Sequence, residues 1–535
     1  MASSDTKNDC STRKDIRIGD GSQWHFVGGK WLEDQQGWIS PPQVGPRELN
    51  CETQLAFLTQ PCYSDLRVSY EFRYEEKFNI NADGSARFLF RAGSASQHYM
   101  IEFPLCGQSA RYKNFWARIA RADPDGYDRE LLMCHMPQIN PQYGRWYRVE
   151  LECVGSRISA TIDGVQLPTV YDERYAVGRV GFGAFIHPQF RNVCLEGKEV
   201  AAPAWLTDES PKTWCHIGDP SLGANQGPHA LCRTAGGNLL MYVGSEGAYF
   251  RVISKDGGKT WTKPEPVDGT APIFLRLLRD GRILGRVDYR SHALVFSSDE
   301  GLTWSQPLEP VLHGEWPVPK EKAPVEWERS PIELSDGSLV QNLRHPRGDL
   351  DGPYSIHAWG NNHCSYYSTR STDGGQNWSQ PVNLDSPKWP GQENIFGSLD
   401  LSESCTTGTR GDGVISLHRP LYSPGSWLCR SLDGGATWLP AVRAPFANYT
   451  PGVICTSSGA ILAGGRFPNN SIHVSYDDGY TWTLGTRVDH TVGQTPTMVE
   501  AEPGVVLIVY HEHGASPAIT RAQRVRITHA GVEPA

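Results

Sequence analysis

The sequence predicts an all-β protein with two domains, a β-sandwich followed by a six-bladed β-propeller. Three observations predict this fold. A Ser-x-Asp-x-Gly-x-Thr-Trp pattern returns five times in the second half, runs of alternating polar and apolar residues fill the first half, and the 535 residues include 55 Gly and 38 Pro. A chain of this length exceeds one ordinary domain, and its composition is typical of a protein with many turns.

The repeated pattern is the strongest of these signals. Its five copies begin at Ser254, Ser297, Ser371, Ser431 and Ser475. Each follows an apolar run, so we interpret each as a hairpin turn in which the Asp accepts backbone N–H groups, a glycine takes a positive φ and the Trp packs beneath. Recurrence about every forty residues, with longer gaps where inserts occur, matches the size of a four-stranded propeller blade.

The pattern resembles the Asp-box, or BNR repeat, of the sialidase superfamily, and the resemblance covers roughly residues 210–530. It implies a sialidase-like propeller with the boxes on the rim away from the active face, so it predicts a fold rather than an activity. We assign six blades, the last without a box, to residues 226–262, 271–305, 327–379, 396–439, 449–483 and 494–528.

Residues 15–200 carry no Asp-box and are predicted to fold separately. Period-two alternation through most of this region predicts an antiparallel sandwich. Residues 144–164 resemble the late strands of concanavalin-like (laminin-G-like) jelly rolls, many of which bind sugars through exposed aromatic side chains. Tyr99, Phe115 and Trp116 are candidates for that role, and the alternative is that they belong to the core. Residues 201–212 are interpreted as a linker and residues 213–530 as the propeller.

Composition excludes several classes of partner. The formal charge of −9 and the absence of a basic run argue against nucleic acid, and no stretch is long and apolar enough to span a bilayer. The polar N-terminus lacks a secretion signal, so either the protein stays inside the cell or a signal has been removed. The 13 cysteines lack CxxC pairs, which favours reduced thiols. The sequence leaves the oligomeric state open.

Topology predicts where a site would form. If all inner strands run the same way, the residues just before each inner strand and just after each second strand emerge on one face. These segments are rich in His, Arg, Tyr and Glu. The candidate catalytic residues are His229, Glu328, His345, His418 and Tyr449. The candidate substrate-binding residues are Arg290, Arg344, Arg419, Arg466, Gln494 and His511.

The sialidase resemblance can be tested residue by residue. Those enzymes hold a substrate carboxylate with three arginines, use a tyrosine assisted by a glutamate as nucleophile, and use an aspartate as acid/base. Glu328 matches the glutamate, and Arg344 and Arg466 are similar to the second and third arginines. The first arginine is replaced by Gly227-Pro-His229, the aspartate has no counterpart, and the nucleophile position reads Gly493-Gln-Thr-Pro496. Ordinary sialic-acid hydrolysis is therefore not expected.

Several functions remain open at this level. A terminal, anionic sugar of an oligo- or polysaccharide fits two arginines, and a His or Tyr could then take the C5 proton of a uronate and cause elimination. Hydrolysis needs two carboxylates, for which Glu328, Glu246, Asp288 and Glu512 are candidates. Alternatives are a sialidase-like exo-glycosidase with a rearranged site and a non-catalytic glycan-binding protein. No cofactor is predicted, although His511 and His513 with His418 or His345 could hold a divalent ion, and a structural Ca²⁺ also stays open.

Overall fold

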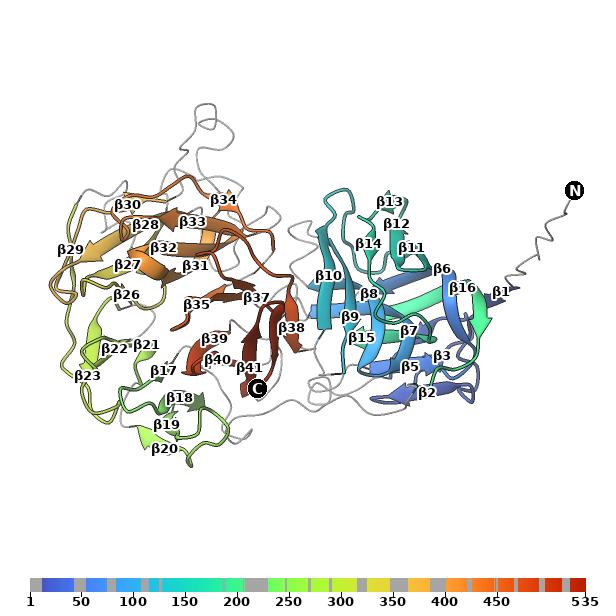
Figure 1. Ribbon diagram of the computed structural model, residues 1–535, viewed down its shortest axis with the longest axis horizontal. Coiled ribbons are helices and arrows are strands. Elements are labelled where there is room, and N and C mark those ends of the chain that lie inside the picture. Colours follow the sequence, from blue (N-terminus) through green and yellow to red (C-terminus); the bar gives the residue numbers. More distant parts are fainter. Residues whose placement is uncertain are drawn as a thin grey trace, which may run out of the picture. The chain divides into compact units, whose positions relative to one another are not determined.

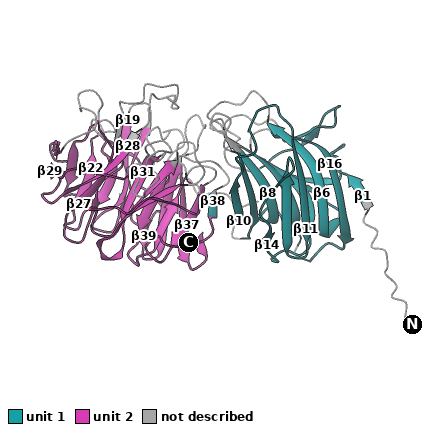
Figure 2. Cartoon of the chain, turned by 90° about the horizontal axis from the view of Figure 1, so that it is seen from above, with its two compact units in different colours: residues 1–213, 486–491 teal, residues 214–485, 492–535 magenta. Residues whose placement is uncertain are grey.

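A computed structural model gives the fold of most of the chain. It describes residues 12–42, 54–74, 83–106, 115–124, 128–185, 188–204, 206, 230–245, 248–267, 271–287, 291–314, 325–346, 364–384, 401–420, 426–446, 448, 451–465, 470–489, 496–511 and 520–535. The only helix in these ranges is the three-residue 3-10 helix Arg410–Asp412, so no described helix is long and apolar enough to cross a membrane. Tertiary contacts divide the chain into unit 1, residues 1–213 with 486–491, and unit 2, residues 214–485 with 492–535 (Figure 2).

Unit 1 contains two antiparallel sheets, which confirms the predicted sandwich. The first sheet runs in the order β13 (Val165–Gln166), β12 (Arg157–Ile162), β11 (Tyr147–Val154), β6 (Cys62–Tyr74), β16 (Pro188–Val200), β4 (Ile39–Ser40), β3 (Leu32–Glu33), with β1 (Thr12–Asp15) on β16 and β14 (Val170–Tyr171) on β12. The second runs in the order β2 (Trp24–Val27), β5 (Gln54–Leu58), β15 (Arg179–Phe185), β7 (Asp83–Ser94), β8 (Gln97–Cys106), β9 (Trp116–Ala122), β10 (Asp128–His135), β38 (Thr486–Asp489).

The core between these sheets is rich in aromatic side chains, because alternate residues of both sheets face inward. Phe72 and Phe103, one from each sheet, stack with ring centroids 4.7 Å apart. Tyr99, Phe115 and Trp116 are at most 4% exposed, and Tyr99 and Phe115 belong to this core. The expectation that these three rings present a sugar-binding surface is therefore wrong, because burial against neighbouring rings removes them from solvent.

Strand β38 comes from a part of the sequence that was assigned to the propeller. It pairs antiparallel with β10, where Arg487 lies opposite Asp128. The Nη1 atom of Arg487 donates to both carboxylate oxygens of Glu102, at 3.1 and 3.0 Å. The sequence of these four residues does not predict such a long-range pairing, because it has the pattern of one more exposed strand.

The described residues of unit 2 form six groups of antiparallel strands around a common axis (Figure 1). Blade 1 is β17 (Leu231–Arg233), β18 (Leu239–Ser245), β19 (Ala248–Ser254), β20 (Glu265–Val267), and blade 2 is β21 (Ile273–Leu277), β22 (Ile283–Arg286), β23 (Leu294–Ser297). Blade 3 is β25 (Glu326–Trp327) and β26 (Ile332–Glu333) beside β27 (Leu339–Pro346), β28 (Cys364–Ser371), β30 (Val382–Asn383). Next to it, β24 (Val311–Leu312) pairs with β29 (Asn377–Trp378).

The remaining blades complete the ring. Blade 4 is β31 (Leu401–Gly408), β32 (Val414–Pro420), β33 (Trp427–Ser431), β34 (Val442–Arg443), blade 5 is β35 (Gly452–Cys455), β36 (Ile461–Gly464), β37 (Asn470–Ser475), and blade 6 is β39 (Thr497–Glu502), β40 (Val505–His511), β41 (Thr520–Thr528), β42 (Gly531–Pro534). The inner strand of blade 6 contacts the inner strand of blade 1 as well as that of blade 5. The predicted propeller is confirmed, with six groups of strands among the described residues, and the last of them extends past residue 528 to β42.

The five Asp-boxes share one hydrogen-bond pattern, seen clearly in the first. The Ser254 hydroxyl donates to Asp256 at 2.8 Å and accepts the Gly258 N–H at 2.7 Å, while Thr260 donates its N–H and hydroxyl to Asp256 at 2.9 and 2.6 Å. Gly258 has a φ of +90°, and a Cβ there would lie 2.9 Å from Leu507 of blade 6. The glycine is therefore required both by the turn and by the close approach of the preceding blade.

Candidate active site

The inner strand of blade 3 is interrupted after Glu328, whose N–H still donates to the Asn342 carbonyl at 3.1 Å. Strand β25 pairs with β27 through Glu326 and Arg344, and pairing resumes only at Ile332 in β26. Between them Arg329 has a φ of 57°, a left-handed conformation that non-glycine residues seldom adopt. Such strain persists where the surroundings impose it, and it is concentrated at functional sites.

Side chains from two strands hold this irregular segment. Arg286, at the end of β22 and 0% exposed, donates Nη1 to the Trp327 carbonyl at 2.9 Å. Gln341 of β27 donates Nε2 to the Glu328 carbonyl at 2.6 Å. Arg329 lies over the ring of Phe274, 5.7 Å from its centroid, and donates to the Pro451 carbonyl at 3.4 Å. Segments that precede or begin the inner strands of blades 2, 3 and 5 therefore meet at one end of the propeller.

The carboxylate of Glu328 is surrounded by donors and a second acid. Tyr366 donates its hydroxyl to Oε1 at 3.3 Å, and the Ser404 N–H donates to Oε2 at 3.4 Å. Arg344 Nε lies 3.6 Å from Oε1. Burial raises the pKa of Glu328, the Arg344 guanidinium opposes that rise, and the charge of Glu403 reinforces it. A carboxyl group with a raised pKa can exchange protons closer to neutral pH, which suits general acid or base catalysis.

Arg344 already has carboxylate partners within its own blade. Its Nε donates to Glu326 Oε2 at 2.9 Å, its Nη2 also contacts that oxygen, and its side chain is 16% exposed. Because Glu326 is 39% exposed, solvent reaches this pair from the same end of blade 3. A substrate carboxylate at Arg344 would have to compete with Glu326.

His418 is completely buried behind Tyr366. Its Nε2 lies 2.9 Å from the Ser416 hydroxyl, and its ring stands edge-on to Tyr366 with centroids 5.0 Å apart. Burial lowers the pKa of His418 to about 3, so its imidazole is neutral at physiological pH. His418 is therefore placed to hold Tyr366 in position and is not exposed to substrate.

Arg419, the neighbour of His418, is 1% exposed and donates Nη1 to Glu403 Oε2 at 3.0 Å. The structure therefore brings four predicted residues together at the junction of blades 3 and 4: Glu328, Arg344, His418 and Arg419. Sequence reasoning missed Glu403, Glu326 and Tyr366. A single carboxylate in Leu-Ser-Glu-Ser-Cys-Thr-Thr, residues 401–407, was the available signal for Glu403.

For the other predicted residues, the structure describes either the backbone alone or nothing. His345 and His511 lie at the ends of β27 and β40, where only the backbone is described. The residues outside the described ranges are His229, Arg290, Tyr449, Arg466, Gln494 and His513. Among the described residues, no three His, Cys, Asp or Glu side chains are placed to hold a metal ion together.

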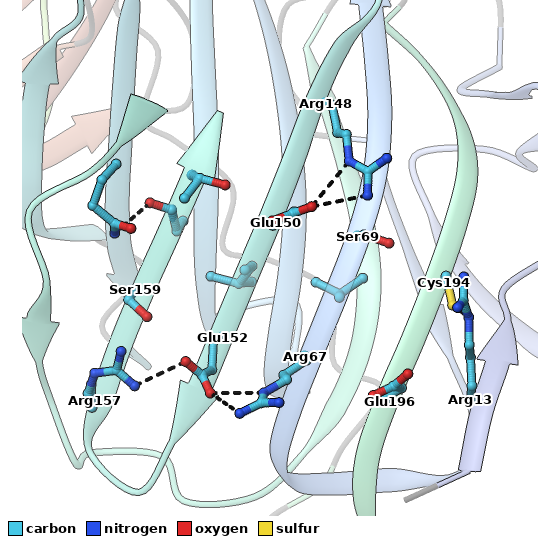
Figure 3. A pocket seen from close by; sticks show the side chains of 15 residues that line it. Arg13, Arg67, Ser69, Arg148, Glu150, Glu152, Arg157, Ser159, Cys194 and Glu196 are labelled. Atoms are coloured by element: carbon cyan, nitrogen blue, oxygen red, sulfur yellow. Dashed lines mark hydrogen bonds and ion pairs between the residues drawn. The ribbon is translucent and has the colours of Figure 1, made fainter. Parts of the chain in front are cut away.

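Unit 1 carries a polar groove of about 430 Å³ on the outer face of its first sheet (Figure 3). Ser69 and Ser159 lie between two sets of ion pairs. The pairs are Arg148 with Glu150, and Glu152 with Arg67 and Arg157. Among the described residues that line the groove, none is aromatic. Its hydroxyl and charged groups could bind a polar ligand by hydrogen bonding, without the stacking surface expected from the sequence.

A comparison with known protein families identifies the first Asp-box. The BNR/Asp-box repeat family model matches residues 252–263, which include the end of β19 and the whole of the first box. No curated protein sequence is detectably similar. The family match, together with the geometry of the five boxes, confirms the Asp-box propeller that the resemblance to the sialidase superfamily predicted.

Three solved structures are similar to the chain at low identity. A protein of unknown function from Dyadobacter fermentans is 17% identical, with a TM-score of 0.44, 59% of this chain and 98% of that chain covered. A leech intramolecular trans-sialidase in complex with 2,7-anhydro-Neu5Ac is 12% identical, with a TM-score of 0.41 and coverage of 88% and 95%. The carbohydrate-binding module CBM66 from Bacillus subtilis is 16% identical, with a TM-score of 0.26 and coverage of 33% and 96%.

Proposed function

We propose that the chain is a carbohydrate-active enzyme that cleaves a terminal, anionic sugar from an oligo- or polysaccharide, by hydrolysis or by elimination. The observation that carries this proposal is Glu328. A carboxyl group with a raised pKa lies on an interrupted strand, beside an arginine and a tyrosine, at the end of the propeller where several inner strands begin. Perturbed carboxyl groups in such surroundings are typical of catalytic sites.

The described residues support different roles. Glu328 would donate or accept the proton at the scissile bond, and Tyr366 would fix its orientation. Arg344 would bind the sugar carboxylate, in competition with Glu326. His418 would support Tyr366 as a positioning residue, and Arg419 would act through Glu403.

The residues outside the described ranges, or without described side chains, keep the roles that the sequence predicts. His229, His345 and Tyr449 would transfer protons. Arg290, Arg466, Gln494 and His511 would contact substrate. An elimination mechanism depends on these residues, because His418 is too deeply buried to take a proton from a sugar. This sequence has no counterpart of the nucleophilic tyrosine, the acid/base aspartate or the first arginine of sialidases, which argues against ordinary sialidase chemistry.

A panel of glycans that end in uronic or sialic-type sugars tests the proposal. Elimination would give an unsaturated product seen by ultraviolet absorbance, and hydrolysis would give new reducing ends without that absorbance. We expect Glu328→Gln to lose activity by about 100-fold or more, as for loss of a general acid or base. Glu309→Gln, the same change at an exposed position, should keep full activity. Turnover that survives Glu328→Gln, or none by the unaltered chain on any glycan, would contradict the proposal.

A second candidate function is glycan binding without catalysis, which the polar groove of unit 1 favours. In that case glycans should bind without turnover, and Arg67→Ala should weaken binding whereas Glu328→Gln should not. Titration calorimetry with the same glycans distinguishes the two functions.

A further inference from the structure

Glu403 occupies a β-bulge in the inner strand of blade 4. Ser402 pairs with Arg419 and Ser404 pairs with His418, so Glu403 is the extra residue between two regular pairs. A bulge turns one side chain away from the usual alternation and is frequent beside active sites. The side chain of Glu403 is 33% exposed, whereas that of its neighbour Ser404 is buried.

Arg419 fixes the direction of the Glu403 carboxylate. The guanidinium is buried, and its Nη1 donates to Glu403 Oε2 at 3.0 Å. A buried arginine favours the ionised form of a carboxylate that it contacts. One end of Glu403 is therefore anchored to protein while part of its surface remains open to solvent.

Glu403 also lies beside Glu328. The N–H of Ser404, the next residue, donates to Glu328 Oε2 at 3.4 Å. The negative charge of Glu403 adds to the rise in the pKa of Glu328. The groups that act on Glu328 thus include Glu403 on β31, Arg344 on β27, Tyr366 on β28 and Arg329.

We propose that Glu403 is the second catalytic carboxylate of the site, that it acts with Glu328 across a glycosidic bond, and that the reaction is therefore hydrolysis. This inference rests on the proposed function and makes its reaction type specific. It assigns a residue that the sequence did not indicate, whereas Glu246, Asp288 and Glu512 lie outside the described residues.

The step balances with water as co-reactant. Glu328 in its acid form donates a proton to the glycosidic oxygen as the bond from that oxygen to the anomeric carbon breaks. Glu403 in its ionised form takes a proton from a water molecule whose oxygen bonds to the anomeric carbon. The products are the free sugar and the shortened glycan, and solvent returns the proton from Glu403 to Glu328. Nothing is oxidised or reduced.

Carboxyl NMR titration of the full chain, labelled with ¹³C in glutamate, tests the pairing without any glycan. The Glu328 signal is assigned by its loss in Glu328→Gln. We expect its pKa to fall in Glu403→Gln, since a like charge is removed, and to stay the same in Glu309→Gln. A Glu328 pKa that is unchanged in Glu403→Gln would overturn the inference even if no glycan were turned over.

Kinetics on a glycan that the panel identifies test the catalytic role. We expect Glu403→Gln to lower kcat/KM about 100-fold or more and to abolish the acidic limb of its pH profile, the limb that an ionised base produces. Glu403→Asp keeps a negative charge beside Arg419, but its side chain is one methylene shorter and moves the carboxylate away from the substrate. This variant should therefore fold and still lose activity. Full activity in Glu403→Asp would show that Glu403 serves only as a counterion for Arg419. An unsaturated product formed by the unaltered chain would show that the reaction is elimination. Either result would overturn the inference.

Discussion

The pKa values of two glutamates with little solvent exposure, one in each unit, shift in opposite directions. Burial alone would raise the pKa of Glu102, but Arg487, Arg87 and Arg118 hold it well below its ordinary value. Burial also raises the pKa of Glu328, where Arg344 opposes the rise and Glu403 adds to it. The outcome thus depends on which charges face the carboxylate and not on burial alone.

The difference separates a structural role from a candidate catalytic one. Glu102 is 2% exposed and accepts hydrogen bonds from arginines on β9 and β38, so its charge is fully compensated. Glu328 has one arginine at 3.6 Å, a tyrosine and a second acid. Complete compensation fixes a carboxylate in one ionisation state, whereas incomplete compensation leaves it able to exchange a proton.

The largest expected effect is at Glu102. Glu102→Gln leaves three buried arginines without their shared carboxylate, and the free energy of unfolding of unit 1 should fall by roughly 3 to 5 kcal/mol. Urea denaturation of the full chain measures this. Glu150→Gln, on the exposed face of the same unit, should change it by less than about 1 kcal/mol. If both changes lowered the free energy of unfolding equally, the ion pairs of Glu102 would be no more important for stability than those of an exposed glutamate.

Acid should destabilise the propeller through its Asp-boxes. Hydrogen bonds within the turn outweigh desolvation and lower the pKa of Asp299 to about 2, and backbone hydrogen bonding lowers that of Asp373 to about 2. Because these folded-state values lie below the ordinary 3.8, the stabilisation is present above about pH 4 and is lost as the pH falls toward 2. The free energy of unfolding of unit 2, measured from pH 6 to about 2, should depend less steeply on pH when both aspartates are replaced by Asn. An equally steep loss in that variant would show that other groups carry the acid sensitivity.

A smaller effect on stability is expected at Glu328. Glu328→Gln removes a carboxyl group that burial disfavours in its ionised form, so the free energy of unfolding should rise or change by less than about 1 kcal/mol. The urea assay used for Glu102→Gln makes the comparison direct. A loss as large as that of Glu102→Gln would place Glu328 among the structural carboxylates.

The smallest effect is expected at His418. Its imidazole is neutral above about pH 3, so His418→Asn should lower kcat a few-fold through Tyr366 and leave the pH profile of activity unchanged. Measuring the profile of that variant beside the unaltered chain checks this. Loss of a titrating limb in His418→Asn would show that this histidine transfers protons itself.

Local patterns predicted the parts of the fold that local chemistry determines. The Asp-box is a turn closed by its own side chains, so Ser254, Asp256 and Gly258 specify it within a few residues. The alternation in unit 1 likewise predicted its antiparallel sandwich. The addition of β38 to unit 1 was not predictable, because it depends on Glu102, some 380 residues away in the sequence.

The site was predictable in position more than in role. Strand order placed Glu328 and Arg344 at one end of the propeller because they flank an inner and a second strand. His418 lies near the end of β32 and is buried, and alternation along that strand alone does not tell which of its faces is buried. The bulge lies in the neighbouring strand β31. Glu403 was missed for that reason, since the bulge that exposes it has no sequence signature.

The most direct test of the central claim is a crystal of the Glu328→Gln chain soaked with a glycan fragment that the unaltered chain cleaves. We expect the sugar at the junction of blades 3 and 4, within hydrogen-bond distance of Glu403 and Arg344. A sugar bound only in the groove between Arg67 and Arg148 of unit 1, with that junction empty, would contradict the account.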